Sequence, residues 1–466
     1  MQPHALLLPY PETGHINPLM QLAKHLASQG ILVTFVNTQY NHQRILQSNA
    51  GRLPADLGLS IRLLDIPDTL SDGENRDNDL YSFSQIILNI GPALENLIDK
   101  LTAGGERITC LISDALAVQT LVVAKKYGIP RVAFWPPSGS AYAFCSHYVR
   151  AATQGTLPRN GLLQPDEIVS FPELPSLQGW KLPWLIAEDQ AINEYVFGSV
   201  IETMEVCAQS EWILGNCVHE LEGSVIPSHF KRLTPIGPIL PSSTLQRASA
   251  KDNLSTTSLW TEEDSCLQWL DAQKPKSVLY VSLGSIAIVD KDQFHELALA
   301  LEAAKLAILW VVRDDLTGEK GTQLPEGFLE RTQERMKIVS WSPQVLVLSH
   351  SAIGGFLTHC GWNSSMEALS MGIPLLLWPQ FADQYINADT LAKWGVGLKM
   401  TDARRKPVGR EIITAQVGKL MLEQEGEVVR ARAMEVRHLM LKAVEEGGSS
   451  FNNLQAFVSW MKALPA

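Results

Sequence analysis

The chain has 466 residues, of which 45% are hydrophobic and 19% are charged. This length exceeds what one hydrophobic core usually organises, so two domains are expected. The 38 Lys and Arg residues against 49 Asp and Glu give a formal net charge of −11, which disfavours binding to nucleic acids or anionic membranes. Any phosphate ligand is therefore expected to be held by local hydrogen bonds and dipoles, not by a basic surface.

The N-terminal sequence MQPHALLLPYPETGH has no basic segment before its short apolar run, so it is predicted to be a first strand and not a signal peptide. No apolar run reaches the roughly 20 residues that a membrane helix needs, which predicts no membrane insertion. Six cysteines without a disulfide-like spacing favour a reducing compartment. We therefore expect a cytoplasmic protein, and a monomer.

Short apolar runs alternate with longer helical patterns in both halves, which predicts βαβ units and parallel sheets. Residues 1–240 and 265–445 are expected to form two Rossmann-like α/β domains that face each other across a cleft, joined by a polar linker at 241–264. The strands are predicted at 5–8, 31–37, 61–64, 109–112, 131–134, 212–214, 278–282, 307–312, 337–339, 356–359 and 374–377.

The first helix is predicted to begin at Asn17 and Pro18, a capping residue followed by proline. His15 would then lie in the loop beyond a parallel strand, at the edge where open α/β sheets bind ligands. Asp114 has the matching position after a neighbouring strand. A neutral imidazole can accept a hydroxyl proton near neutral pH, and a carboxylate can orient it. Alternatively, His15 is a helix-start residue and Asp114 caps the helix near Val118.

Residues 341–384 contain an apolar run, a turn at Gly361 and a helical pattern that Asn363 and Ser364 open. Ser364 with Glu367 fits a capping box, so the helix is predicted to begin there with its unpaired N–H groups facing the turn. Such a helix end binds phosphate readily.

The groups around this turn suit a sugar nucleotide. Trp341 could stack on a base, His359 could donate to an anionic oxygen, and Glu367 could accept from ribose hydroxyls. Asp383 and Gln384 offer a carboxylate and an amide to sugar hydroxyls. Each could also be structural, as a core aromatic, a strand-end histidine or half of a capping box. The whole set in this order indicates a nucleotide-sugar site.

This segment resembles the signature box of plant family-1 UDP-glycosyltransferases and has the same length. The resemblance implies that the first Trp stacks on uracil, that Gln and Glu contact uridine, that His, Asn and Ser hold the diphosphate, and that the later Trp with Asp-Gln holds the sugar. Ser285, after the strand at 278–282, resembles a second phosphate contact of the family. The donor-binding residues by position are Ser285, Trp341, Gln344, His359, Trp362, Asn363, Ser364, Glu367, Asp383 and Gln384.

The resemblance further implies the two-domain glycosyltransferase B fold, with a C-terminal helix in 446–466 that returns to the first, acceptor-binding domain. It assigns His15 as the base and Asp114 as its partner in an inverting transfer that gives a β-glycoside. The UDP-sugar is a co-substrate, and neither a cofactor nor a metal is expected. Gln384 favours UDP-glucose as the donor.

The acceptor is expected to be a small lipophilic hydroxyl compound, such as a flavonoid, another phenolic or a terpenoid. The first domain supplies aromatic candidates for its pocket, although a core role is the alternative for at least half of them. These candidates are Phe134, Tyr142, Phe144, Trp180, Trp184 and Tyr195.

Three alternative functions have less support in the sequence. Residues 77–79 match the D-x-D pattern of metal-dependent glycosyltransferases, but they lie in a polar loop far from the phosphate-binding turn. An NAD-dependent oxidoreductase would need a G-x-G-x-x-G string, which the chain lacks. A non-catalytic sugar-nucleotide sensor would keep the box without needing His15 and Asp114.

Overall fold

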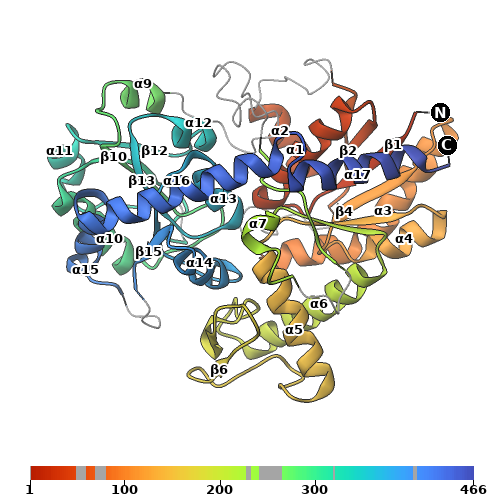
Figure 1. Ribbon diagram of the computed structural model, residues 1–466, viewed down its shortest axis with the longest axis horizontal. Helices are drawn as coiled ribbons and strands as arrows, with labels where there is room; N and C mark the ends of the chain where they lie inside the picture. Colours follow the sequence, from red (N-terminus) through yellow and green to blue (C-terminus); the bar gives the residue numbers. More distant parts are fainter. Residues whose placement is uncertain are drawn as a thin grey trace.

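The computed structural model describes residues 2–48, 59–68, 80–226, 232–240, 265–318, 321–401 and 407–465. The predicted linker at 241–264 and the D-x-D match at 77–79 lie outside the described residues. The chain forms two α/β lobes that lie side by side (Figure 1). The expected α/β class with two Rossmann-like domains is confirmed.

The first lobe is built on a seven-stranded sheet of order β3-β2-β1-β4-β5-β8-β9, with every pair parallel. Its strands are β1 (His4–Leu8), β2 (Leu32–Thr38), β3 (Ile61–Ile66), β4 (Cys110–Asp114), β5 (Arg131–Trp135), β8 (Trp212–Gly215) and β9 (Thr234–Pro235). Its helices are α1 (Thr13–Ser28), α2 (Gln39–Ser48), α3 (Leu80–Ala103), α4 (Gln119–Tyr127), α5 (Gly139–Gln154), α6 (Gln190–Gln209) and α7 (His219–Glu222). A short hairpin, β6 (Ile168–Val169) with β7 (Leu177–Gln178), lies beside α5.

The second lobe has a six-stranded parallel sheet of order β12-β11-β10-β13-β14-β15. Its strands are β10 (Val278–Ser282), β11 (Ala307–Val311), β12 (Met336–Val339), β13 (Ile353–Thr358), β14 (Leu375–Leu377) and β15 (Gly397–Lys399). Its helices are α9 (Ser265–Asp271), α10 (Lys291–Ala304), α11 (Phe328–Thr332), α12 (Gln344–Ser349), α13 (Trp362–Met371), α14 (Gln384–Lys393), α15 (Arg410–Leu422) and α16 (Gln424–Val444). The short strands β9 and β15 were not predicted, because their sequences carry no extended apolar run.

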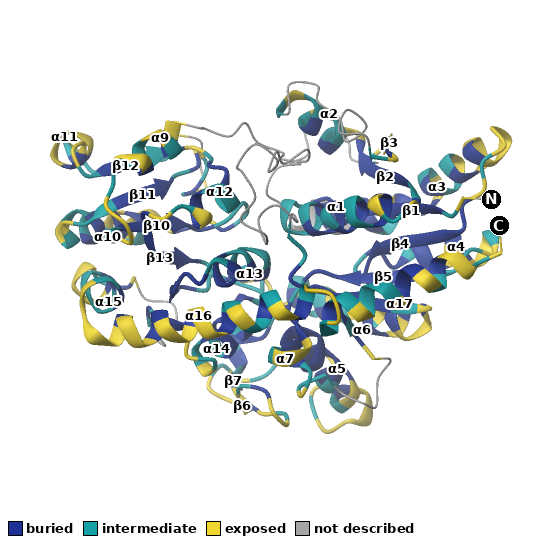
Figure 2. Ribbon diagram, turned by 45° about the horizontal axis from the view of Figure 1, so that its top comes forward, coloured by how far each residue is buried: buried dark blue, intermediate teal, exposed yellow. Residues whose placement is uncertain are grey.

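The central strands of both sheets are buried on both faces, which explains why they are largely apolar, whereas the edge strands β3 and β12 are only partly buried (Figure 2). In β1, Ala5 and Leu7 pack toward α1, whereas Leu6 and Leu8 pack toward α3 and α4. This alternation follows from the two-residue period of a strand. The second sheet likewise packs between α13 and α16 on one face and α10 and α15 on the other.

The last helix, α17 (Ser449–Ala463), leaves the second lobe and packs on the first. It follows α16, which runs from the second lobe toward the first, and it ends close to the N-terminus (Figure 1). Its Phe457 is fully buried, contacts Trp212 of β8 and stacks on Trp460. The C-terminal helix therefore completes one face of the first hydrophobic core.

Two predicted helix starts are wrong. Helix α1 begins at Thr13, not at Asn17, because the Glu12 carboxylate accepts the Gly14 N–H at 2.9 Å and caps the helix earlier. Helix α13 begins at Trp362 after Gly361, with no side-chain cap. The predicted capping box does not form, because Ser364 and Glu367 both bind another side chain described below.

Replacing Phe457 by alanine is expected to lower the free energy of unfolding by about 3 kcal/mol, since it removes a fully buried aromatic ring. Denaturant unfolding followed by tryptophan fluorescence measures the effect. The matched control is Val428→Ala on α16, where the side chain is 61% exposed and the change should stay within about 0.5 kcal/mol. Equal stability of the two variants would contradict a structural role for the α17 contact.

Candidate active site

A cavity of about 1430 Å³ lies where the carboxyl ends of the two sheets meet. The first domain contributes the turn after β1, and the second domain contributes the turns after β10, β13 and β14. Open α/β sheets bind ligands at this edge because the loops that follow the strands converge there. The cavity is therefore the candidate active site.

His15 lies in the first turn of α1 and is hydrogen-bonded to Asp114. Its Nδ1 is 2.6 Å from Asp114 Oδ2, and Asp114 Oδ1 accepts the Leu116 N–H at 2.9 Å. Asp114 is the last residue of β4, not a loop residue after a shorter strand as predicted, and it is completely buried. This geometry places the proton of a neutral His15 on Nδ1 and leaves Nε2 as the acceptor atom.

The pKa of His15 is set by two opposing effects. Burial alone would lower it, but the charge of Asp114 and its hydrogen bond, followed by the charges of Glu12 and Asp383, raise the pKa to about 9. The imidazole is therefore mostly protonated at neutral pH. To act as a base, as predicted, it would have to lose this proton first.

The turn after β10 approaches His359 of the second domain very closely. Gly284 has a φ of +79°, and a Cβ atom there would overlap the His359 ring, as would one at Gly361. Arg313 is buried and donates to the carbonyl oxygens of Gly284 and Ala287 at 2.6 and 2.9 Å. The glycines and the arginine together fix the turn that carries Ser285.

Burial, together with the charge of Arg313, lowers the pKa of His359 to about 4. The ring is therefore neutral at physiological pH and interacts with an anion as a hydrogen-bond donor, not as a cation.

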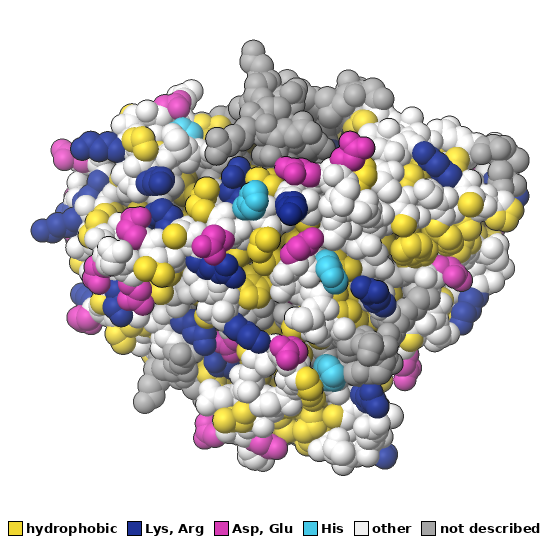
Figure 3. Space-filling view, in the orientation of Figure 1, with side chains coloured by type: hydrophobic (Ala, Val, Ile, Leu, Met, Phe, Trp, Pro, Cys, Tyr) yellow, Lys and Arg dark blue, Asp and Glu magenta, His cyan; other side chains and the backbone are white. Residues whose placement is uncertain are grey.

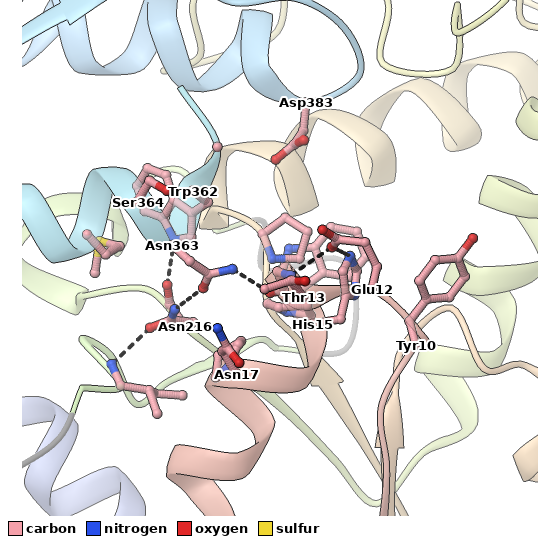
Figure 4. Close-up of a pocket in the computed structure, with 18 of the residues that line it drawn as sticks. Tyr10, Glu12, Thr13, His15, Asn17, Asn216, Trp362, Asn363, Ser364 and Asp383 are labelled. Atoms are coloured by element: carbon pink, nitrogen blue, oxygen red, sulfur yellow. Dashed lines mark hydrogen bonds and ion pairs between the residues drawn. The ribbon is translucent and has the colours of Figure 1, made fainter. Parts of the chain in front are cut away.

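The N-terminus of α13 is tied to the first domain by an amide chain (Figure 4). Asn363 donates to the Gly14 carbonyl, and Asn216, which follows β8, donates to Asn363 Oδ1 at 2.9 Å. The Gly14 carbonyl is available because its usual helix partner would be the N–H of residue 18, and Pro18 has none. The two domains are thus joined through the helix end predicted to bind phosphate.

Trp362 lines the cavity and is also bound to the first domain. Its indole N–H donates to the Asn216 carbonyl at 2.6 Å, and its ring is buried against Trp394. The side chain therefore bridges the two domains, and its contact with the sugar stays a prediction.

Gln344 organises the predicted uridine side of the cavity. Its Nε2 donates to Ser364 Oγ at 2.9 Å and to Glu367 Oε2 at 2.7 Å, and its Oε1 accepts from Tyr280. Burial raises the pKa of Glu367 to about 7, although the bond from Gln344 opposes this shift. Trp341 also lines this part of the cavity.

Asp383 and Gln384 line the same cavity from the turn before α14. Burial raises the pKa of Asp383, and its Oδ2 accepts from Asn387 at 2.9 Å. The Gln384 Oε1 accepts the N–H groups of Gln380 and Phe381, so its oxygen shapes the turn. Figure 4 shows Asp383 across the cavity from His15.

The six aromatic candidates for the acceptor pocket divide between the cavity lining and the core, as the sequence left open. Only Tyr195 lines the cavity, whereas the other five lie outside its lining. Four of these are fully buried because they fill the first lobe's cores, and the fifth, Trp180, packs on Tyr385. The buried four are Phe134, Tyr142, Phe144 and Trp184.

Aliphatic side chains form most of the lining on the acceptor side. They come from α3, the turn after β4, the segment before α6 and α6 itself, and no sequence pattern sets them apart from core residues. They include Ile87, Leu116, Val118, Pro183, Ile186, Ile192, Val196 and Val200. Glu12 and Asn216 were also missed, because single polar residues in turns carry no motif.

Acidic and basic side chains are interspersed over the face seen in Figure 3. Among the described residues, no helix is long and apolar enough to cross a membrane. Within the same residues, no group of three or more His, Cys, Asp or Glu side chains is placed to hold a metal ion.

Comparison with known proteins identifies the family. Residues 260–405 match the model of the UDP-glucoronosyl and UDP-glucosyl transferase family. The 7-deoxyloganetin glucosyltransferase of Catharanthus roseus is 34% identical, over 100% of this chain and 98% of that protein. The (R)-mandelonitrile beta-glucosyltransferase of Prunus dulcis is 35% identical, over 98% and 97%.

Solved structures agree with these relatives. Phytolacca americana UGT2 in complex with UDP-2fluoro-glucose and pterostilbene has a TM-score of 0.79 and 27% identity, over 99% of this chain and all of the other. TcCGT1 in complex with UDP has a TM-score of 0.82 and 27% identity, over all of both chains. The chain belongs to the plant family-1 UDP-glycosyltransferases. It has their glycosyltransferase B fold, and it transfers a sugar from a UDP-sugar co-substrate to a small-molecule acceptor.

The pH dependence of kcat/KM should reveal the His15–Asp114 pair. With an aliphatic alcohol as acceptor, kcat/KM is expected to rise with pH toward an apparent pKa near 9, because His15 must be neutral to accept a proton. In Asp114→Asn the carboxylate charge is lost, so the rising limb should move to lower pH while the maximum rate falls. An Asp114→Asn limb at the wild-type position would contradict the pairing.

Proposed function

We propose that the protein is an inverting glucosyltransferase that moves glucose from UDP-glucose to a hydroxyl group of a small lipophilic acceptor and forms a β-glycoside. The observation that carries the proposal is the His15–Asp114 hydrogen bond at the same cavity as the open N-terminus of α13. A base and an anion-binding helix end are the two parts that this reaction needs.

In the proposed reaction, the acceptor oxygen attacks the anomeric carbon from the side opposite UDP. Its proton passes to Nε2 of His15, while Asp114 stabilises the resulting imidazolium. The bond between the anomeric carbon and the β-phosphate oxygen breaks, and its electron pair leaves with UDP. Ser285, His359 and the α13 N-terminus are placed to stabilise the charge on the leaving diphosphate.

We assign donor recognition to residues 265–445 and acceptor recognition to residues 1–240, with 446–466 as the returning segment. Trp341 would stack on uracil, Gln344 and Glu367 would contact the ribose, and Asp383 with Gln384 would bind the sugar. The names of both relatives support glucose as the sugar. The aliphatic lining supports a flavonoid, another phenolic or a terpenoid as acceptor.

We also propose that the protein acts as a monomer in the cytoplasm. The absence of a membrane-spanning helix among the described residues and six buried free cysteines are compatible with a reducing compartment.

His15→Ala is expected to lower kcat by at least about 100-fold, because a general base contributes roughly that much or more. The measurement is glucoside formation from UDP-glucose with a panel of phenolic and terpenoid alcohols. UDP binding by calorimetry should be retained, which separates loss of the base from misfolding. The exposed His438→Ala on α16 is the control and should keep wild-type activity. Equal activity of wild type and His15→Ala would remove His15 from the mechanism, and UDP-glucose binding without turnover would favour the sensor.

Turnover is expected to be independent of metal ions, because the proposed diphosphate site consists of hydroxyl, amide, imidazole and backbone donors. Activity in excess EDTA should therefore stay within about twofold of the untreated rate, a change too small for loss of a metal that binds the diphosphate. Loss of activity in EDTA that manganese restores would contradict this mechanism.

A further inference from the structure

The turn at Glu12 to Gly14 of the first domain is bound to two predicted diphosphate contacts of the second. Ser285 Oγ donates to Glu12 Oε1 at 2.9 Å, and the Asn363 amide donates to the Gly14 carbonyl. Both contacts cross the cleft, and Figure 4 shows Glu12 beside His15 and Thr13 at its centre. The turn therefore occupies hydrogen-bond donors that a diphosphate would otherwise use.

Glu12 brings a carboxylate into the anion-binding part of the cavity. Its side chain is 13% exposed, and its Oε2 accepts the Gly14 N–H at 2.9 Å and lies 3.9 Å from His15 Nε2. Both oxygens are thus fixed, one by the cap of α1 and the other by Ser285. The Glu12 carboxylate therefore accepts from the same Ser285 hydroxyl that is proposed to donate to a phosphate oxygen.

We propose that Glu12 is an internal competitor for the diphosphate, which weakens the binding of UDP more than that of UDP-sugar and so favours product release. This inference rests on the proposed assignment of Ser285 to the diphosphate. When the anomeric bond breaks, its electron pair stays on the β-phosphate, whereas the proton of the acceptor goes to His15. At pH 7 the terminal phosphate of UDP therefore carries up to about one more negative charge than the diester in UDP-sugar.

Like charges a few ångströms apart in a partly buried cleft repel each other more strongly than in water. The repulsion between Glu12 and the phosphate is therefore larger for the product than for the donor. The same repulsion opposes departure of UDP in the chemical step. Glu12 therefore slows the glycosyl transfer step and speeds the dissociation of UDP. The net effect is a higher kcat when product release is the slow step.

Glu12→Gln removes the charge and keeps a side chain that can still bond both Gly14 and Ser285. Calorimetry with UDP, together with KM for UDP-glucose and the product-inhibition constant of UDP, measures its effect in the full chain. We expect UDP to bind about tenfold tighter and UDP-glucose at most about threefold tighter. The ratio of the two constants is the diagnostic, because a general disturbance of the site would weaken both ligands.

Two further variants make the test decisive. Glu12→Asp keeps a good helix cap and the charge but shortens the reach toward Ser285, so the ratio of the UDP and UDP-glucose binding constants should stay close to that of wild type. Glu411→Gln removes an exposed carboxylate of the second domain and should leave both constants unchanged.

The possible results distinguish failure of the role proposed for Glu12 from failure of the donor-site assignment. If wild type binds UDP and Glu12→Gln binds it no tighter, or tightens both ligands equally, the role of Glu12 in release is refuted. If neither protein binds UDP, the donor-site assignment itself fails. If Glu12→Gln does not fold, Glu12→Asp decides the question. A shift of the ratio of the two binding constants toward tighter UDP in that variant, which keeps the charge, also refutes the inference.

Discussion

The contact between the first turn of α1 and the N-terminus of α13 fixes the relative position of the two domains at the site. Asn363 reaches the Gly14 carbonyl only because Pro18 leaves that carbonyl without its helical partner. The same turn carries His15, so this one interaction fixes the proposed base of the first domain relative to the proposed diphosphate site of the second. A residue at position 18 with a backbone N–H would bond the Gly14 carbonyl within α1 and weaken its hydrogen bond with Asn363.

An acidic chain binds an anionic donor here without a basic surface. The groups that face the expected diphosphate are mostly neutral donors: a serine hydroxyl, an amide, a helix end and the imidazole of His359, whose pKa is held low by burial and by Arg313. Arg313 itself donates its hydrogen bonds to the carbonyls of the turn after β10 and to Asp315. Selectivity for a diphosphate thus arises from oriented donors at close range, whereas a long-range field would attract any anion.

Sequence patterns predicted the parts of the structure that depend on local chemistry. Apolar runs located the long strands, because strands buried on both faces are mostly apolar. The order of residues in 341–384 singled out side chains that the structure brings to one cavity. The patterns failed where a contact outside the expected motif decides the local structure. The Glu12 carboxylate caps α1 earlier than predicted, and Gln344 binds both members of the expected capping box. The acceptor lining could not be predicted either, since an aliphatic residue facing a cavity has the same composition as one facing a core.

The return of α17 to the first domain has a consequence for synthesis of the chain. The first domain is translated long before its last structural element, so its β8 face stays without the cover of Phe457 and Trp460 while the second domain is made. An exposed apolar face of this kind invites association with other chains. The first domain is therefore expected to reach its final packing only after residues 449–463 have emerged from the ribosome.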